Sequence, residues 1–125
     1  MKRVVGIGGI FIKAADPVAL RDWYQRHLGV DVQDWGGAVF PNDRPGGMTV
    51  WNLFPETTDY FSPSRAGFMV NYVVEDLDGV LAALRAEGCD VDSKVEDSDF
   101  GRFGWVMDPE GNRVELWQPP SGPSA

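Results

Sequence analysis

Residues 16–32 read DPVALRDWYQRHLGVDV, and residues 76–91 read DLDGVLAALRAEGCDV. Each stretch opens with an aspartate, continues with apolar residues at helical spacing, reaches a glycine and then resumes as an extended segment. An apolar, extended segment also precedes each stretch, at 6–15 and at 67–75. A pattern that occurs twice in so short a chain predicts two similar modules that share one core, with a cleft between them.

Both predicted helices carry clear signals at their ends. Asp16 and Asp76 can cap the first turn through their side-chain oxygens, and Pro17 suits the first helical position. Gly29 and Gly88 can adopt the left-handed conformation that ends many helices. The expected apolar stripes are Leu20, Trp23, Tyr24, His27 and Leu28 in the first helix, and Leu77, Val80, Leu81 and Leu84 in the second.

The remaining segments read mostly as strands. We expect strands at 8–14, 30–35, 37–41 and 48–54 in the first module, and at 68–75, 90–95, 102–107 and 112–118 in the second. Asp108–Asn112 has the residues of a type I turn and predicts a hairpin between the last two strands. The whole chain, 1–125, is then one domain: module one at 1–54, a polar linker at 55–67, module two at 68–118 and a tail at 119–125.

Composition excludes several classes of partner. The chain has 125 residues, 43% of them hydrophobic, and 11 Lys and Arg against 19 Asp and Glu, which gives a net charge of −8. Nucleic acids and anionic membranes bind clustered Lys and Arg, so we expect neither as a partner. Cys89 is the single cysteine and cannot form an internal disulfide, and no segment is long and apolar enough to be a transmembrane helix. We therefore expect a cytoplasmic protein.

The period-2 alternation of the strands separates an apolar face from a mixed one. The apolar face should lie under the helices, and the mixed face suits a concave ligand-binding surface. The mixed face collects Gly9, Phe11, Lys13, Met69, Asn71, Val73, Arg113, Glu115 and Trp117.

Two segments carry a resemblance to a known family: AADPVALRDWYQRHLG (14–29) and MDPEGNRVELWQP (107–119). They resemble the Asp-led first helix and the DP-x-G-N turn with its Glu-bearing strand in the vicinal oxygen chelate superfamily. That superfamily includes glyoxalase I, bleomycin-resistance proteins and extradiol dioxygenases. The resemblance spans about residues 4–119 and implies an α+β fold, in which two βαβββ modules form a cupped mixed sheet with the helices on the outer face.

The resemblance also implies where a metal would bind, because the family places its ligands on the first and last strands of each module. Those positions fall at Gly9, Trp51, Met69 and Glu115, and only Glu115 is a family ligand. A catalytic divalent ion needs about three His, Asp or Glu ligands. His27, the one histidine, lies near the end of the first helix, where a structural role is favoured. We therefore expect no cofactor and no family-type divalent metal.

Glu115 is the sharpest candidate for a catalytic residue, and two interpretations remain open. A carboxylate inside a partly apolar cup can act as a general base. Alternatively, Glu115 forms a structural ion pair with Arg113 or Lys13. The expected ligand-binding residues are Phe11, Lys13, Trp51, Met69, Asn71, Trp105, Arg113 and Trp117.

Two functions follow from these residues and from the resemblance. The first is a binding protein that holds a small organic molecule, aromatic ones included, in the cup without metal chemistry, as bleomycin-resistance proteins bind without catalysis. The second is a lyase, isomerase or dioxygenase-like enzyme that uses Glu115 as general base or as ligand of an atypical metal site. The resemblance also implies a homodimer.

Overall fold

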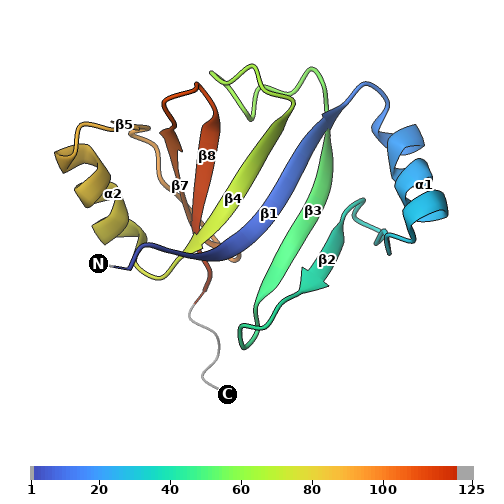
Figure 1. Ribbon diagram of the computed structural model, residues 1–125, viewed down its shortest axis with the longest axis horizontal. Helices are drawn as coiled ribbons and strands as arrows, with labels where there is room; N and C mark the ends of the chain where they lie inside the picture. Colours follow the sequence, from blue (N-terminus) through green and yellow to red (C-terminus); the bar gives the residue numbers. More distant parts are fainter. Residues whose placement is uncertain (1, 121–125) are drawn as a thin grey trace.

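The structure, a computed structural model, describes residues 2–120 and has an α+β fold with two helices and one open, mixed sheet of eight strands (Figure 1). This confirms the predicted fold class. The strand order is β2-β3-β1-β4-β8-β7-β5, and β6 pairs with β7. The elements are β1 (Val4–Ala14), α1 (Pro17–Leu28), β2 (Ala38–Pro41), β3 (Met48–Pro55), β4 (Phe68–Val74), α2 (Leu77–Ala86), β5 (Asp90–Val91), β6 (Glu96–Ser98), β7 (Gly101–Met107) and β8 (Arg113–Gln118).

The two halves of the sheet meet at β1 and β4, which are antiparallel neighbours in the middle of the sheet. Within the first half, β1 pairs parallel with β3, and Phe11 lies opposite Asn52. Within the second half, β4 pairs parallel with β8, and Asn71 lies opposite Glu115. Asn52 in the first half therefore corresponds to Glu115 in the second.

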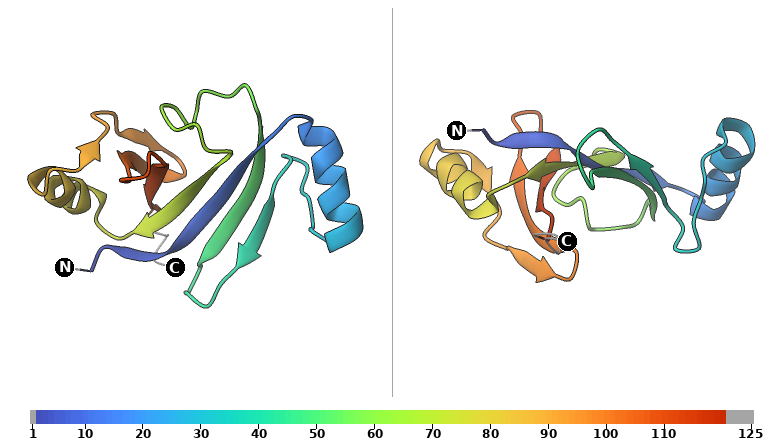
Figure 2. Two further views of the ribbon diagram at one scale, coloured as in Figure 1. Left: turned by 45° about the horizontal axis from the view of Figure 1, so that its top comes forward. Right: turned by 90° about the horizontal axis from the view of Figure 1, so that it is seen from below.

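The two helices lie at opposite ends of the twisted sheet, as the views in Figure 2 show. Asp16 caps α1 by accepting a hydrogen bond from the Ala19 amide, and Asp76 caps α2 by accepting one from Gly79. Gly29 (φ 68°) and Gly88 (φ 83°) both adopt the left-handed conformation. The predicted helix signals are confirmed at both ends of both helices.

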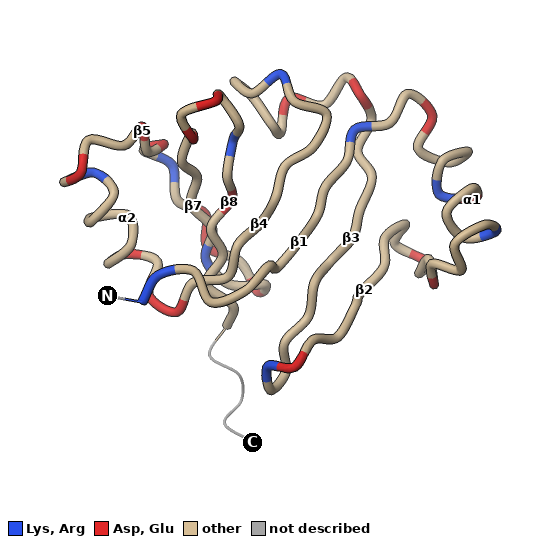
Figure 3. The backbone as a smooth tube through the Cα atoms, viewed as in Figure 1, with Lys and Arg blue, Asp and Glu red and all other residues tan. Residues whose placement is uncertain are grey.

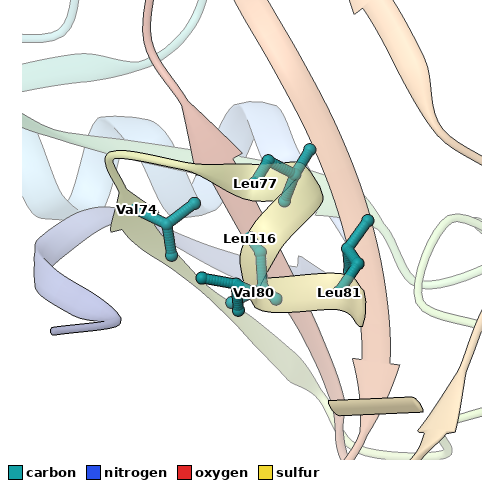
Figure 4. Close-up of a cluster of buried hydrophobic side chains, with 5 residues drawn as sticks. All are labelled: Val74, Leu77, Val80, Leu81 and Leu116. Atoms are coloured by element: carbon teal, nitrogen blue, oxygen red, sulfur yellow. The ribbon is translucent and has the colours of Figure 1, made fainter. Parts of the chain in front are cut away.

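Each helix packs on its own hydrophobic cluster, and the two clusters differ. Under α2, five fully buried side chains gather: Val74, Leu77, Val80, Leu81 and Leu116 (Figure 4). Under α1, the buried residues are Ala38, Trp51 and Leu53, all from strands. No residue of α1 is buried, and Trp23 and Leu28 are 48% and 62% exposed. The prediction of one continuous apolar stripe against the sheet is therefore wrong at Trp23, Leu28 and also His27, which is exposed, because α1 packs on the sheet through its Leu20 and Tyr24 side.

Three strand predictions need correction. The segment 30–35 forms no strand, because it bends into a turn in which the Gln33 amide donates to the Gly37 carbonyl at 2.8 Å. The strand predicted at 90–95 is limited to β5, and β6 occupies three residues where no strand was predicted. The first half therefore supplies three strands and the second half five.

Charge is distributed unevenly over the sheet. β3 and β4 carry no charged residue, and β1 carries only Lys13, near its end. Charged residues lie mainly on the helices, the turns and the far strands of the second half (Figure 3). Within residues 2–120, no helix is long and apolar enough to cross a membrane.

Candidate ligand-binding site on the inner face

Glu115 lies in the middle of β8 on the sheet face opposite the helices, which we call the inner face, and it is 1% exposed. Its Oε1 accepts a hydrogen bond from Asn71 Nδ2 at 2.6 Å. Its Oε2 accepts one from Trp105 Nε1 at 2.9 Å and another from the Tyr60 hydroxyl. Three uncharged donors thus compensate for the lost hydration of this buried carboxylate.

Strand register explains two of these three contacts. Asn71 is the parallel partner of Glu115 on β4, and Trp105 is its antiparallel partner on β7. Paired residues on neighbouring strands point to the same face, so both side chains reach the carboxylate. Of the two interpretations of Glu115 left open by the sequence, the structural ion pair with Arg113 or Lys13 is wrong, because within residues 2–120 neither cation is among the partners of the carboxylate.

The third donor, Tyr60, comes from the segment 55–67, which crosses one end of the sheet between β3 and β4 (Figure 1). This segment was predicted to be a polar linker, yet Phe61 is fully buried in it and packs with Met69 and Trp105. Burial, and then the adjacent Glu115 carboxylate, raise the pKa of Tyr60. Tyr60 therefore stays protonated and donates its hydrogen to Glu115.

Aromatic side chains cover much of the inner face around this network. The rings of Phe54 and Tyr60 stack at a centroid distance of 5.6 Å, and those of Phe103 and Trp117 stack at 6.1 Å. Phe11 packs edge-on against Phe54 at 5.6 Å. These rings are only partly buried, so the inner face presents flat apolar surface beside the covered carboxylate.

The predicted cationic residues lie against aromatic rings of this face. The Lys13 ammonium lies over the Phe61 ring at 5.4 Å. The Arg113 guanidinium lies over the Trp105 ring at 4.9 Å and pairs with Asp92 at 3.2 Å. The Arg113 Nε is buried and has no hydrogen-bond partner among residues 2–120. Hydrogen bonding from the Lys94 backbone amide, followed by the contact with Arg113, lowers the pKa of Asp92.

A cavity of about 250 Å³ lies beside the stacked Trp105–Arg113 pair. Its lining combines the second half of the sheet with the segment that crosses it: Pro63, Asp90, Asp92, Trp105, Val106, Met107 and Arg113. Two predicted ligand-binding residues therefore belong to its wall: Arg113, which is partly buried, and Trp105, which is only 1% exposed. Met69 and Asn71 are almost completely buried, so they support this face from beneath.

Trp51 was predicted to lie in the cup, and this prediction is wrong. Trp51 pairs with Ile10 on β1 and packs under α1, with its ring 5.0 Å from that of Tyr24. Because neighbours along a strand point to opposite faces, Asn52 lies on the inner face instead. The family ligand position assigned to Trp51 therefore corresponds to Asn52 in the structure.

The four residues at the family ligand positions do not fit a divalent ion held in the family manner. Gly9 has no side chain, Met69 offers a thioether, and Asn52 offers one amide oxygen, which accepts a hydrogen bond from Leu53. Glu115 is approached by N–H and O–H donors, whose positive ends would face a cation bound there. Within residues 2–120, no three His, Cys, Asp or Glu side chains are grouped to hold a metal.

Sequence reasoning missed the role of Gly8 and did not give Tyr60 its place beside Glu115. A Cβ at Gly8 would lie 2.7 Å from the Trp117 ring and would also collide with Asn71 Oδ1. This glycine therefore allows β1 to approach the side chain that donates to Glu115. The sequence signal for Tyr60 was available, because Tyr60 and Phe61 are adjacent aromatics in an otherwise polar segment.

Comparison with known proteins agrees with this architecture. Residues 9–117 match the family model described as the glyoxalase-like domain. A search of curated proteins found no match. Among solved structures, methylmalonyl-CoA epimerase in complex with methylmalonyl-CoA and NH4+ is 18% identical, with a TM-score of 0.73 and coverage of 94% of this chain and 96% of that chain.

Two further structures have similar folds. Methylmalonyl-CoA epimerase from Mycobacterium tuberculosis is 20% identical, with a TM-score of 0.63 and coverage of 93% of this chain and 89% of that chain. A glyoxalase/bleomycin resistance protein/dioxygenase superfamily member from Vibrio splendidus 12B01 is 13% identical, with a TM-score of 0.60 and coverage of 90% and 97%. The class defined by fold and sequence match is thus clear: this chain belongs to the glyoxalase-like domain family.

Proposed function

We propose that this protein binds a small, flat organic molecule on the aromatic inner face, next to Trp105 and Arg113, without a family-type metal. The observation that carries the proposal is the set of hydrogen bonds that the Glu115 carboxylate accepts. In this family the corresponding carboxylate is expected to bind a metal, whereas here its oxygens accept hydrogen bonds from Tyr60, Asn71 and Trp105. The carboxylate thus organises an aromatic wall, and the adjacent cavity of about 250 Å³ offers room for a ligand ring.

The chemistry of the cavity favours a ligand that combines a ring with a polar group. Met107 and Pro63 supply apolar surface, and the buried Trp105 ring lies in the wall of the cavity. Arg113 has one buried N–H without a partner in the part of the chain that the structure describes, and a ligand oxygen could accept a hydrogen bond from it. Asp90 and Asp92 also line the cavity, and Asp92 already pairs with Arg113, so the lining favours a ligand that is uncharged over a strongly anionic one.

The proposal is tested by titrating EDTA-treated protein with indole, 1-naphthol and benzoate while tryptophan fluorescence and the melting temperature are recorded. We expect 1-naphthol to bind, because it combines two fused rings with one hydroxyl group. Arg113→Met should weaken that binding about tenfold, since it removes the unpartnered donor and the stacked cation. Arg102→Met is the matched control, because Arg102 lies near the start of β7, whereas the cavity lies at the end of β7. Arg102 pairs with Asp78 and Asp97 instead.

Two outcomes would overturn the proposal. One is an absence of binding by all three probes up to millimolar concentration. The other is binding that requires Mn²⁺, Co²⁺, Ni²⁺ or Zn²⁺, which would point to a metal site that uses Glu115 in another arrangement.

The second candidate function is an enzyme in which Glu115 transfers a proton. It is favoured by the deep burial of this carboxylate and by the likeness of the fold to methylmalonyl-CoA epimerase. The test is exchange of the α-proton of methylmalonyl-CoA in D2O, followed by NMR. If Glu115 is the base, exchange occurs with the wild-type protein and is lost in Glu115→Gln while ligand affinity is retained. No exchange above the uncatalysed rate counts against this candidate for that substrate.

We also propose that the protein forms a homodimer through the first half of the chain. β2 is an open edge of the sheet without a charged residue, and Val39 and Phe40 on it are exposed. Trp23, Leu28 and Trp35 add exposed apolar surface in the same half. Uncovered apolar edges tend to pair with another chain. Size-exclusion chromatography with light scattering should give twice the mass of the chain, and a monomeric mass at micromolar concentration would contradict this.

A further inference from the structure

The inner-face cavity has a row of three side chains in its lining, one from each of the neighbouring strands β5, β7 and β8. Asp90 on β5 is the antiparallel partner of Met107 on β7, and Met107 is the antiparallel partner of Arg113 on β8. Directly paired residues point to the same face of a sheet. The apolar Met107 side chain therefore lies between an acidic and a basic residue.

The Arg113 guanidinium extends from β8 across β7 towards the chain around β5. It lies over the Trp105 ring at 4.9 Å, and its Nη1 donates to Asp92 Oδ2 at 3.2 Å. Asp92 follows Asp90 by two residues, which separates them by at most about 7 Å along the backbone. The guanidinium and the Asp90 carboxylate therefore border the same part of the cavity.

The hydrogen-bonding capacity of these groups is only partly used. The Asp92 carboxylate accepts from Arg113 Nη1 and, at 2.9 Å, from the Lys94 amide. Asp90 is exposed and forms no ion pair among residues 2–120. Arg113 Nε is buried and has no partner in the same part of the chain. The cavity therefore offers one acceptor, Asp90, and one donor, Arg113 Nε, to a ligand.

We propose that the ligand of this cavity is a planar cyclic amide, or a heterocycle with the same adjacent N–H and C=O groups. This inference rests on the proposed function and names the class of molecule that the inner face binds. The ligand C=O accepts from Arg113 Nε, the ligand N–H donates to Asp90, and the ring lies against Met107 and Pro63. A cyclic amide is uncharged, which suits a lining in which Asp92 already pairs with Arg113.

The probes are 2-quinolone and N-methyl-2-quinolone, and the measurement is isothermal titration calorimetry of the full chain. Both molecules have the same two fused rings and the same C=O group. The methyl group removes the N–H donor. We expect 2-quinolone to bind about fivefold more tightly than its N-methyl derivative, because only 2-quinolone can donate to the Asp90 carboxylate.

Because the methyl group also adds bulk, the role of Asp90 is tested separately. Asp90→Leu should weaken the binding of 2-quinolone about fivefold and change that of N-methyl-2-quinolone less than about twofold, so the difference between the two probes disappears. Asp34→Leu, a matched change of an exposed aspartate in the first half, should change neither affinity. Arg113→Met should weaken both probes alike, since both have the C=O group. Circular dichroism and melting temperature identify any variant that fails to fold, and the comparison of the two probes on the wild-type protein needs no variant.

The failure of this inference is distinguishable from the failure of the proposed function. If 1-naphthol binds and depends on Arg113, but the two quinolones bind equally well, the amide class is wrong and the proposed function stands. The same holds if the preference for 2-quinolone is unchanged in Asp90→Leu, because the N–H group is then recognised elsewhere. If neither 1-naphthol nor either quinolone binds up to millimolar concentration, both proposals are wrong.

Discussion

The two halves of this chain carry the same local helix signals, but their helices are packed to different degrees. Both helices have an aspartate cap and a left-handed glycine at the end. α2 buries Leu77, Val80 and Leu81 against the sheet, whereas α1 buries none of its residues. Helix signals therefore determine where a helix begins and ends, and the surface that it meets determines how much of it is buried.

The same contrast holds on the inner face. Glu115 in the second half accepts hydrogen bonds from three side chains and is almost completely buried. Asn52, at the corresponding position of the first half, is only partly buried, and its side-chain oxygen accepts a hydrogen bond from Leu53. The polar chemistry of the protein is thus concentrated in its second half, and substitutions at matched positions can test this asymmetry.

The largest difference in stability is expected between substitutions of Glu115 and of Asn52, the two corresponding polar residues of the inner face. Glu115→Leu should lower the free energy of unfolding by about 3–5 kcal/mol, because it leaves the buried donors of Tyr60, Asn71 and Trp105 without an acceptor. Asn52→Leu, the matched change in the first half, should cost less than about 1 kcal/mol. Urea unfolding followed by tryptophan fluorescence measures both, and equal losses would refute the asymmetry.

The helices provide the next comparison. Leu81→Ala removes a buried side chain of α2 and should lower the free energy of unfolding by about 2–4 kcal/mol, through lost burial and the cavity left behind. Leu20→Ala on α1 should cost about 1 kcal/mol, because Leu20 is only partly buried and its surroundings can relax. If Leu20→Ala costs as much as Leu81→Ala, α1 is packed more tightly in solution than its exposure indicates.

A pH effect follows from Tyr60 in the segment that joins the halves. Its pKa is raised in the folded protein, so its contribution to stability is fully present below the unfolded value of about 10 and is lost as the pH rises towards the folded value. Above about pH 10 the slope from this residue approaches 1.4 kcal/mol per pH unit. Tyr60→Phe should remove that part of the slope between about pH 10 and 11.5, as measured by urea unfolding. Tyr24→Phe serves as the control on α1, and an unchanged slope in Tyr60→Phe would contradict the burial of the hydroxyl beside Glu115.

The smallest difference is expected at the helix caps, where the two halves are alike. Asp16→Ala and Asp76→Ala each remove one side-chain acceptor from the first turn, at 3.1 Å in both helices. Each should lower the free energy of unfolding by about 1 kcal/mol. A loss at Asp76 more than about twice that at Asp16 would show that packing of α2 adds to the effect of its cap.

Much of the fold could be predicted because its signals are local. The aspartate caps, the terminal glycines and the Asp108–Asn112 turn lie within a few residues of the structure that they determine. Alternation along single strands also placed Glu115, Asn71 and Met69 on one face. The segment 30–35 shows the limit of such reasoning, since its apolar residues resembled a strand but found no partner strand and formed a turn.

The candidate site was only partly predictable, because its geometry depends on pairing between distant strands. The sequence by itself determined the repeated helix signals, the turns and the alternation that puts Glu115 opposite the helix-bearing face. Only the tertiary structure decided that Trp51 points away from that face and Asn52 towards it, because this follows from the register of β3 against β1. It also decided that Tyr60 donates to Glu115 across a separation of 55 residues, because a buried carboxylate needs donors and the chain between the halves brings one to it.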